Sequence, residues 1–561
     1  MRIIIVGGVA AGMSAAARAR RLSEDAEIIV LERGTEVSFA NCGLPYHVSA
    51  EIDDAEDLRL HTPQSLRAAL NLDVRIDHEV TAIDTATRTL TVLSPDGAQT
   101  LAYDALVLAP GAAAVRPPLP GIGSPQVRTL RTVTDAIELR TLVDDGARRA
   151  VVLGAGYIGI EAAEAMRHRG LEVDVVELAP NVLPRIEREL ARVASDELER
   201  LGIRVHAGVA ATAITSLAGV AGATVTLSDG RDITADIVIL SVGVRPDTAF
   251  AMDAGIVTER GAIVVDERGR TSAAGVWAAG DATLSVDATL GIRRPVALAG
   301  PANRAGRLIA DDIFGAAGAR AVPAALGTAI VRIGTITVAS TGANRDDLAA
   351  AGVPFRTLHL HPNQHAGYFP GASAMHLVVH IGDDGALLGA QAAGHDGVDK
   401  RIDVLATAMR AGLGAADLID LDLAYAPPYG QAKDGVNLIG MVAENLLAGR
   451  LRLWYAEDAT DGADALVLDV RRADEFASGH LPGALNIPHT ELRGRLDEVR
   501  IAAAGRPVRV MCAAGVRSNI AYRILVGGGI EATSLSGGIQ TLRQWFGRDA
   551  DQVLTSEGVH A

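Results

Sequence analysis

The sequence predicts an α/β protein of several domains, and three observations point to that class. The chain has 561 residues, too many for a single hydrophobic core. A pattern of buried strand, glycine-rich turn, helix and second strand occurs twice. A separate small α/β segment begins near Asp464. Hydrophobic residues make up 49% of the chain and charged residues 21%, as is typical of folded globular proteins.

Composition also excludes several classes of protein. The net charge of −16 argues against non-specific nucleic-acid binding. Two cysteines, Cys42 and Cys512, are a poor disulfide framework and favour a reducing compartment. The first apolar run breaks at Gly7 and Gly8, no apolar run is long enough for a bilayer, and the histidines form no metal motif. We therefore expect a cytoplasmic protein with no metal, no membrane partner and no nucleic-acid partner.

The first repeated unit begins with a strand at residues 2–6 and continues as a helix to about Leu22. Its second strand, Glu27–Leu31, ends at the acidic Glu32. The intervening glycines are Gly7, Gly8 and Gly12.

The second unit repeats this order, with strands at residues 150–153 and 172–176 and a helix to about Arg169. It carries the full glycine template Gly154, Gly156 and Gly159, and its second strand ends at Glu177. Glycines let the backbone approach a pyrophosphate, the helix N-terminus attracts its charge, and the acid binds a ribose hydroxyl. Two such units predict two dinucleotide sites.

The order of further landmarks resembles the pyridine nucleotide–disulfide oxidoreductases. These landmarks are residues 7–12, 109–112, 154–159, 243–246 and 279–281. The resemblance implies FAD in the first unit, NAD(P)H in the second, and a homodimer formed through an α+β dimerisation domain. The implied bounds are 1–112 with 245–322 for the FAD domain, 113–244 for the NAD(P)H domain and 323–446 for dimerisation.

The same resemblance implies roles for single residues. Glu32 would bind the adenosine ribose of FAD, Asp281 the ribityl chain, Tyr157 would gate the nicotinamide pocket and Glu161 would hold the carboxamide. The other residues expected at the cofactors are Arg33, Asn41, Val80, Ile158, Gly243 and Ala299.

Nucleotide choice depends on Glu177. A carboxylate there accepts hydrogen bonds from a free 2′-hydroxyl and repels a 2′-phosphate, which favours NADH. Arg185 is near enough in sequence to keep NADPH open.

The segment Ser38-Phe-Ala-Asn-Cys42 carries one cysteine where common disulfide reductases carry two. A single thiol beside a flavin must cycle through a mixed disulfide, a persulfide or a sulfenic acid. Cys42 precedes a helix expected near Pro45, whose dipole would lower the thiol pKa.

Single-cysteine relatives divide into oxygen or peroxide reductases and coenzyme A disulfide, persulfide or polysulfide reductases. The first group typically has a histidine in the first glycine loop, and this chain has Val9 and Ala10 there. The chain is therefore similar to the second group, which implies coenzyme A as ligand or substrate. The residues implied to bind it are Ser14, Arg18, Arg21, Ser38, Asn41 and Asn303.

That group also uses tyrosines of the partner's dimerisation domain to protonate a departing thiolate. Tyr368 and Tyr425 match the pattern, and Tyr429 is close enough to Tyr425 to compete for the role.

A linker is expected at 447–463. Beyond it, residues 468–471, 479–488 and 512–517 carry a pattern by which the segment 464–550 resembles the α/β rhodanese domain. Strand 508–511 leads to Cys512, and four residues separate that cysteine from Arg517. Phosphatases of similar fold have a longer loop, so the shorter one favours a sulfane sulfur held by loop amides.

Together these features predict an FAD-dependent NAD(P)H reductase of sulfur–sulfur bonds, whose rhodanese domain carries sulfane sulfur on Cys512. Two alternatives stay open. One is an NADH oxidase or peroxidase that uses a Cys42 sulfenic acid, and the other is a flavin-based redox sensor.

Overall fold

The computed structural model describes residues 1–217, 222–460 and 464–556. The chain divides into two compact units, each described here by itself. One unit joins Met1–Pro180 to Leu201–Gly327, and the other joins Asn181–Arg200 to Thr328–Ala561. Over the described ranges, no helix is both long and apolar enough to cross a membrane.

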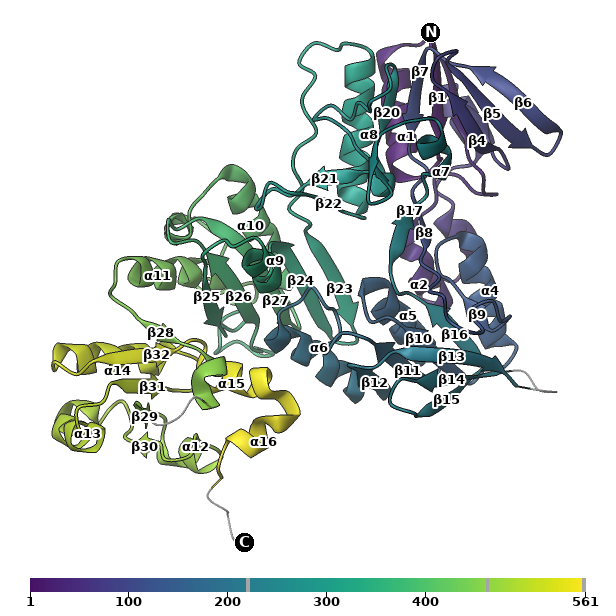
Figure 1. Cartoon of the computed structure of the whole chain (residues 1–561). Coiled ribbons are helices and arrows are strands. Elements are labelled where there is room, and N and C mark those ends of the chain that lie inside the picture. Colours follow the sequence, from purple (N-terminus) through teal and green to yellow (C-terminus); the bar gives the residue numbers. More distant parts are fainter. Residues whose placement is uncertain (218–221, 461–463, 557–561) are drawn as a thin grey trace. The chain divides into compact units, whose positions relative to one another are not determined.

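A five-stranded parallel sheet forms the centre of the first dinucleotide-binding fold (Figure 1). Its strands, in spatial order, are β20 (Val276–Ala278), β7 (Ala105–Leu108), β1 (Arg2–Val6), β2 (Glu27–Leu31) and β3 (Asp73–Arg75). All of β7 and most of β1 and β2 are buried, which explains their continuous apolar runs. One face packs against α1 (Ala10–Leu22) and α8 (Ala299–Ile313). The other packs against the antiparallel strands β4 (Glu79–Asp84), β5 (Thr89–Ser94) and β6 (Gly97–Ala102).

The second repeat gives a second five-stranded parallel sheet in the same unit. Its order is β12 (Ile203–Ala207), β11 (Glu172–Glu177), β10 (Arg149–Leu153), β16 (Ile237–Leu240) and β9 (Val127–Arg128). Helix α5 (Tyr157–His168) follows β10 as the sequence predicts. The antiparallel strands β13 (Ala211–Ser216), β14 (Ala223–Leu227) and β15 (Asp232–Ala235) contribute to the core on one face.

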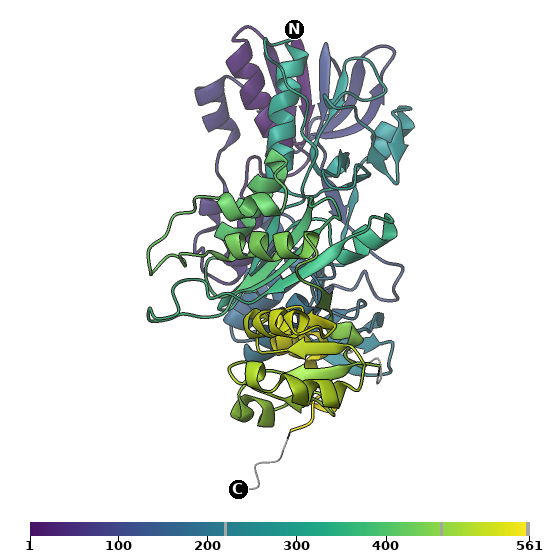
Figure 2. The same ribbon diagram turned by 90° about the vertical axis from the view of Figure 1, so that its left-hand side faces the viewer.

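The other unit contains an antiparallel sheet covered by helices. Its strands are β23 (Ala329–Ile333), β24 (Ile336–Gly342), β27 (Leu387–Gly394), β26 (His376–Ile381) and β25 (Arg356–Leu360). Helices α10 (Val398–Ala411) and α11 (Gly435–Leu447) bury one face of this sheet (Figure 2). Helix α6 (Arg188–Arg200) groups with this sheet, although the sequence places it between β11 and β12.

The C-terminal domain is a parallel sheet flanked by helices. Its strands are β28 (Leu453–Trp454), β32 (Ala532–Leu535), β31 (Val508–Met511), β29 (Leu466–Asp469) and β30 (Leu485–Asn486). Its longest helices are α13 (Leu496–Ala503), α14 (Val516–Gly527) and α15 (Gly538–Phe546). Strand β28 lies inside the range expected as a linker, and residues 461–463 of that range are outside the described residues.

Buried polar contacts join this domain to the antiparallel sheet of the same unit. His359 Nδ1 lies 2.8 Å from Ser536 Oγ, and His361 Nε2 lies 2.7 Å from Thr541 Oγ1. The ring of Trp545 has two guanidinium groups at 5.2 Å from its centroid, those of Arg188 and Arg345. Such contacts fix the domain against the sheet because buried polar groups need partners.

Candidate active sites around two cysteines

In the first glycine loop, the glycine positions leave no room for a side chain. Gly7 has φ +98°, and a Cβ atom there would lie 2.0 Å from the Ala109 carbonyl oxygen. A Cβ on Gly12 would lie 1.9 Å from the oxygen of Gly7. The Glu32 carboxylate accepts the Gly8 N–H at 2.7 Å, which places it beside the loop. A narrow backbone cradle with an acid at its rim fits a dinucleotide pyrophosphate and ribose.

The second loop repeats this geometry. Gly154 has φ +97°, and a Cβ on Gly159 would lie 2.0 Å from its carbonyl oxygen. The Glu177 carboxylate accepts the N–H groups of Ala155 at 2.6 Å and Ala179 at 2.8 Å. Both acids therefore lie beside their loops, as the sequence predicts for dinucleotide binding.

The other residues expected at the cofactors lie on several elements of the same unit. Asp281 is in a short helix after β20, where burial raises the pKa of its carboxyl despite Arg131 at 3.9 Å. Arg33 forms an ion pair with Asp247. The remaining positions are Asn41 beside Cys42, Val80 in the core of β4, Ala299 at the start of α8, Tyr157, Ile158 and Glu161 in the first turns of α5, and Gly243 with φ +108°.

Cys42 is an exposed, unpaired thiol in the 3-10 turn Asn41–Gly43. Desolvation raises its pKa, and the negative charges of Glu161 and Asp281 raise it further. The expected lowering of the Cys42 pKa is not found, because desolvation and the two carboxylates shift it in the opposite direction. The structure thus brings Cys42 together with one residue expected at the nicotinamide and one expected at the flavin.

The residues expected to bind coenzyme A lie on α1, on α8 and in the Cys42 segment. Ser14 Oγ donates to Asn303 Oδ1 at 2.6 Å, so these two residues are neighbours. Arg18 is held by Asp311 at 2.6 Å, and Arg21 is exposed on the last turn of α1. Ser38 has φ +52°, and its N–H donates to the Gly8 carbonyl at 2.8 Å, beside the first glycine loop.

Two of the three candidate tyrosines meet in the other unit. The hydroxyl oxygens of Tyr368 and Tyr425 are 3.3 Å apart. Their hydrogen bond raises the pKa of Tyr368. Tyr425 and Tyr429 also line a pocket of about 310 Å³ with Lys400. All three tyrosine side chains are exposed.

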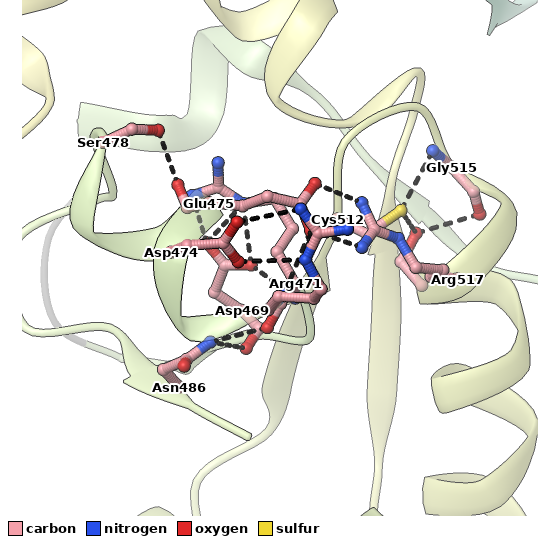
Figure 3. Close-up of polar contacts among 11 residues, drawn as sticks. Asp469, Arg471, Asp474, Glu475, Ser478, Asn486, Cys512, Gly515 and Arg517 are labelled. Carbon is pink, nitrogen blue, oxygen red and sulfur yellow. Dashed lines mark hydrogen bonds and ion pairs between the residues drawn. The ribbon is translucent and has the colours of Figure 1, made fainter. Parts of the chain in front are cut away.

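Cys512 follows β31 and is only 1% exposed. The Gly515 N–H donates to its sulfur at 3.2 Å (Figure 3). Ser518 Oγ lies 3.5 Å from the same sulfur. Ser518 in turn accepts a hydrogen bond from Ser534 Oγ at 3.0 Å. The Cys512 carbonyl accepts the Ile539 N–H of α15 at 2.9 Å. These contacts make a rigid loop around one sulfur, suited to a thiolate or a persulfide.

Arg517 lies at the same loop and is held by a carboxylate. Its two terminal nitrogens each lie 2.7 Å from an oxygen of Glu475, which belongs to α12 (Ala473–Ala477). This bidentate pairing raises the pKa of Arg517 and lowers that of Glu475 to about 2. Figure 3 shows the pair beside Cys512 and near the buried Arg471–Asp469 pair.

Sequence reasoning missed Glu475, Ser534 and Arg131. Glu475 lies between residues 468–471 and 479–488, two segments that resemble rhodanese domains, and this position was the available signal. Ser534 and Arg131 lie far in sequence from their partners, and no local pattern marks them.

Comparisons with known proteins agree with this geometry. Residues 1–306 match the family model for pyridine nucleotide-disulphide oxidoreductases, and residues 328–434 match the dimerisation domain of that family. Residues 454–544 match the rhodanese-like domain.

A coenzyme A disulfide reductase from Staphylococcus epidermidis is 34% identical over 448 residues, which cover 79% of this chain and 100% of that protein. The crystal structure of reduced Bacillus anthracis CoADR-RHD is 36% identical, with a TM-score of 0.94 and 99% of each chain covered. An NAD-dependent persulfide reductase from A. fulgidus is 34% identical, with a TM-score of 0.89, and covers 96% of this chain and 100% of its own. The chain therefore belongs to the pyridine nucleotide-disulphide oxidoreductase family and carries a rhodanese-like domain at its C-terminal end.

Proposed function

We propose that this oxidoreductase uses Cys42 as its single redox-active thiol to reduce the sulfur–sulfur bond of coenzyme A disulfide, coenzyme A persulfide or polysulfide. The placement of one unpaired cysteine near both Glu161 and Asp281 carries this proposal. Both cysteines of the chain are free, so no dithiol pair is available for the usual disulfide exchange. Relatives described as a coenzyme A disulfide reductase and a persulfide reductase support the same substrate class.

The family implies FAD and NAD(P)H, and the two glycine cradles fit them. Bound FAD supplies the transfer of two electrons from the nicotinamide to sulfur. Glu32 and Glu177 hold the ribose hydroxyls in this proposal, and Asp281 and Glu161 orient the reacting ends. Glu177 favours NADH because its carboxylate repels a 2′-phosphate. Arg185, the cation that could offset this charge, is paired with Asp347 at 2.6 Å.

Coenzyme A would bind along α1 and α8. Ser14 and Asn303 form a polar pair, and Arg21 offers a cation to the phosphates. The charge of Arg18 is largely offset by Asp311, so we expect Arg18 to contribute less than Arg21.

The chemistry proposed for the first site begins when the Cys42 thiolate attacks one sulfur of the substrate. A Cys42–sulfur bond forms, the substrate sulfur–sulfur bond breaks, and the departing thiolate takes a proton from Tyr425. Tyr368 positions that hydroxyl through their 3.3 Å contact. Two electrons then cleave the mixed disulfide, which restores the Cys42 thiolate and releases the second sulfur product. The dimerisation domain suggests a homodimer. In this proposal Tyr425 and Tyr368 of one protomer act at the Cys42 site of its partner.

In the C-terminal domain, Cys512 would carry a sulfane sulfur as a persulfide. The Gly515 N–H donates a hydrogen bond to that sulfur, the thiol donates to Ser518 Oγ, and the charge of Arg517 lies nearby. Fusion to the reductase raises the local concentration of one site's product at the other.

Steady-state NADH oxidation with coenzyme A disulfide, coenzyme A persulfide and polysulfide, each supplied separately, tests this function. We expect turnover with at least one of the three that exceeds turnover with oxygen or hydrogen peroxide. Faster consumption of oxygen or peroxide would instead identify an oxidase or peroxidase. Failure to turn over NADH with any acceptor would favour a redox sensor.

A further inference from the structure

The electrostatics of the Cys512 loop differ from what the sequence alone suggests. An arginine beside a reactive sulfur looks like a site for a strongly anionic sulfur donor. In the structure that positive charge is engaged, because Arg517 makes two 2.7 Å contacts with Glu475. Both side chains are 24% exposed, so solvent only partly screens the pair.

Two neighbouring arginines, Arg471 and Arg472, are also paired with carboxylates. Arg471 is buried and pairs with Asp469 at 2.6 Å. Arg472 pairs with Asp474 at 2.9 Å. Arg472 Nε also lies 3.8 Å from Glu475 Oε2, but its shorter contact is with Asp474.

We propose that Glu475 sets the donor specificity of the Cys512 site by withholding the charge of Arg517 from doubly charged sulfur donors. A donor with charge on both its sulfane sulfur and its leaving group must compete with Glu475 for Arg517. A donor with a single negative charge depends less on Arg517, so competition with Glu475 weakens its binding less. Specificity of this kind is a difference between two binding free energies, achieved by a group that disfavours one ligand.

Both kinds of donor transfer their outer sulfur to Cys512 by displacement of a leaving group. The Cys512 thiolate attacks the outer sulfur of thiosulfate, a sulfur–sulfur bond to Cys512 forms, and the bond to the SO₃ group breaks. Sulfite leaves with the bonding electrons, and Cys512 becomes a persulfide anion. Benzenethiosulfonate reacts in the same way and releases benzenesulfinate. Cyanide then takes the outer sulfur as thiocyanate and restores the thiolate.

The test compares thiosulfate, a dianion, with benzenethiosulfonate, a monoanion, in the full-length holoenzyme with cyanide as acceptor. Glu475→Gln should raise the ratio of kcat/KM for thiosulfate to that for benzenethiosulfonate by about tenfold, the size expected for one partly screened charge. Glu498→Gln removes the same charge from an exposed arginine pair on α13 and should leave the ratio unchanged. Glu475→Asp, which keeps the charge, should keep the ratio near that of the unmodified enzyme.

A merely structural role for Glu475 would lower activity with both donors alike and leave their ratio unchanged, which would overturn the inference. An increase in the ratio for Glu498→Gln equal to that for Glu475→Gln would overturn it as well. The inference rests on the proposed sulfur transfer at Cys512. If the unmodified enzyme forms thiocyanate from neither donor, that proposed activity fails and the inference falls with it. Transfer by the unmodified enzyme without a change in the ratio would refute the role of Glu475 alone.

Discussion

The two cysteines occupy opposite kinds of environment. Cys42 is exposed in a short turn, and desolvation together with the nearby carboxylates Glu161 and Asp281 raises its thiol pKa. Cys512 is buried, and its sulfur accepts a backbone N–H in a loop that also holds Arg517. A thiol that must react with large substrates and a cofactor needs access, whereas a sulfur carrier needs stabilisation of one anionic atom. The exposed turn gives Cys42 its access, and the Cys512 loop gives its sulfur a backbone hydrogen bond.

Exchange of each cysteine for serine gives the largest expected effect. Cys42→Ser should reduce turnover of sulfur–sulfur substrates by about a thousandfold or more, because the one other cysteine of the chain, Cys512, belongs to the rhodanese-like domain. Formation of thiocyanate at Cys512 should persist in that variant. Cys512→Ser should abolish thiocyanate formation and preserve the turnover of sulfur–sulfur substrates. NADH oxidation and thiocyanate formation, both measured on each variant, check the comparison, and loss of both activities from either change would show that the sites are not independent.

The next largest effect concerns proton donation at the Cys42 site. Tyr425→Phe removes the hydroxyl proposed to protonate the leaving thiolate and should lower kcat by about a hundredfold. Tyr368→Phe should lower kcat less, because that hydroxyl acts through Tyr425. Steady-state kinetics with the preferred disulfide substrate measure both. Tyr429→Phe serves as the control, and a larger loss there than in Tyr425→Phe would reassign the donor.

Much of the fold follows from the sequence because its signals are local. The strands β1, β2 and β31 and the two glycine loops combine apolar runs with turn residues, and the structure contains them at the expected positions. The Cys512 loop is likewise contained in one short segment. Contacts between distant segments have no such signal, and Ser534 with Ser518 and His361 with Thr541 are examples. The electrostatics of Cys42 also depend on Glu161 and Asp281, which approach it only in the folded chain.

A smaller effect concerns the carboxylates around Cys42. Since the charge of Glu161 raises the Cys42 pKa, Glu161→Gln should lower that pKa and increase the thiolate fraction at pH 8. We expect alkylation of Cys42 by iodoacetamide to accelerate by about threefold. Glu164→Gln, on the same helix, is the matched control. Equal alkylation rates in the two variants would show that Glu161 does not raise the pKa of this thiol.

The smallest expected effect concerns the stability of the unit that holds Cys512. Burial, with a contribution from His395, lowers the pKa of His376 to about 4. The ordinary histidine pKa is about 6.5, so the neutral ring stabilises the fold fully above that pH. This contribution declines as the pH falls from about 6.5 towards 4, because the unfolded chain then binds a proton that the folded chain does not. His376→Gln should reduce the loss of Tm between pH 7.5 and pH 5 by about 2 °C. The exposed His168→Gln should retain the full loss, and an unchanged loss in His376→Gln would refute the assignment.

The polar contacts between the C-terminal domain and the antiparallel sheet have a consequence for any attempt to separate the domains. A chain cut after Leu447 would lose Ser536, Thr541 and Trp545, the groups that now cover His359, His361 and Arg345. Water would reach side chains that the intact protein keeps hidden, and a shortened enzyme would need new surface residues there to remain soluble. The C-terminal domain is therefore more than an added module, because the antiparallel sheet carries polar side chains whose partners lie in that domain.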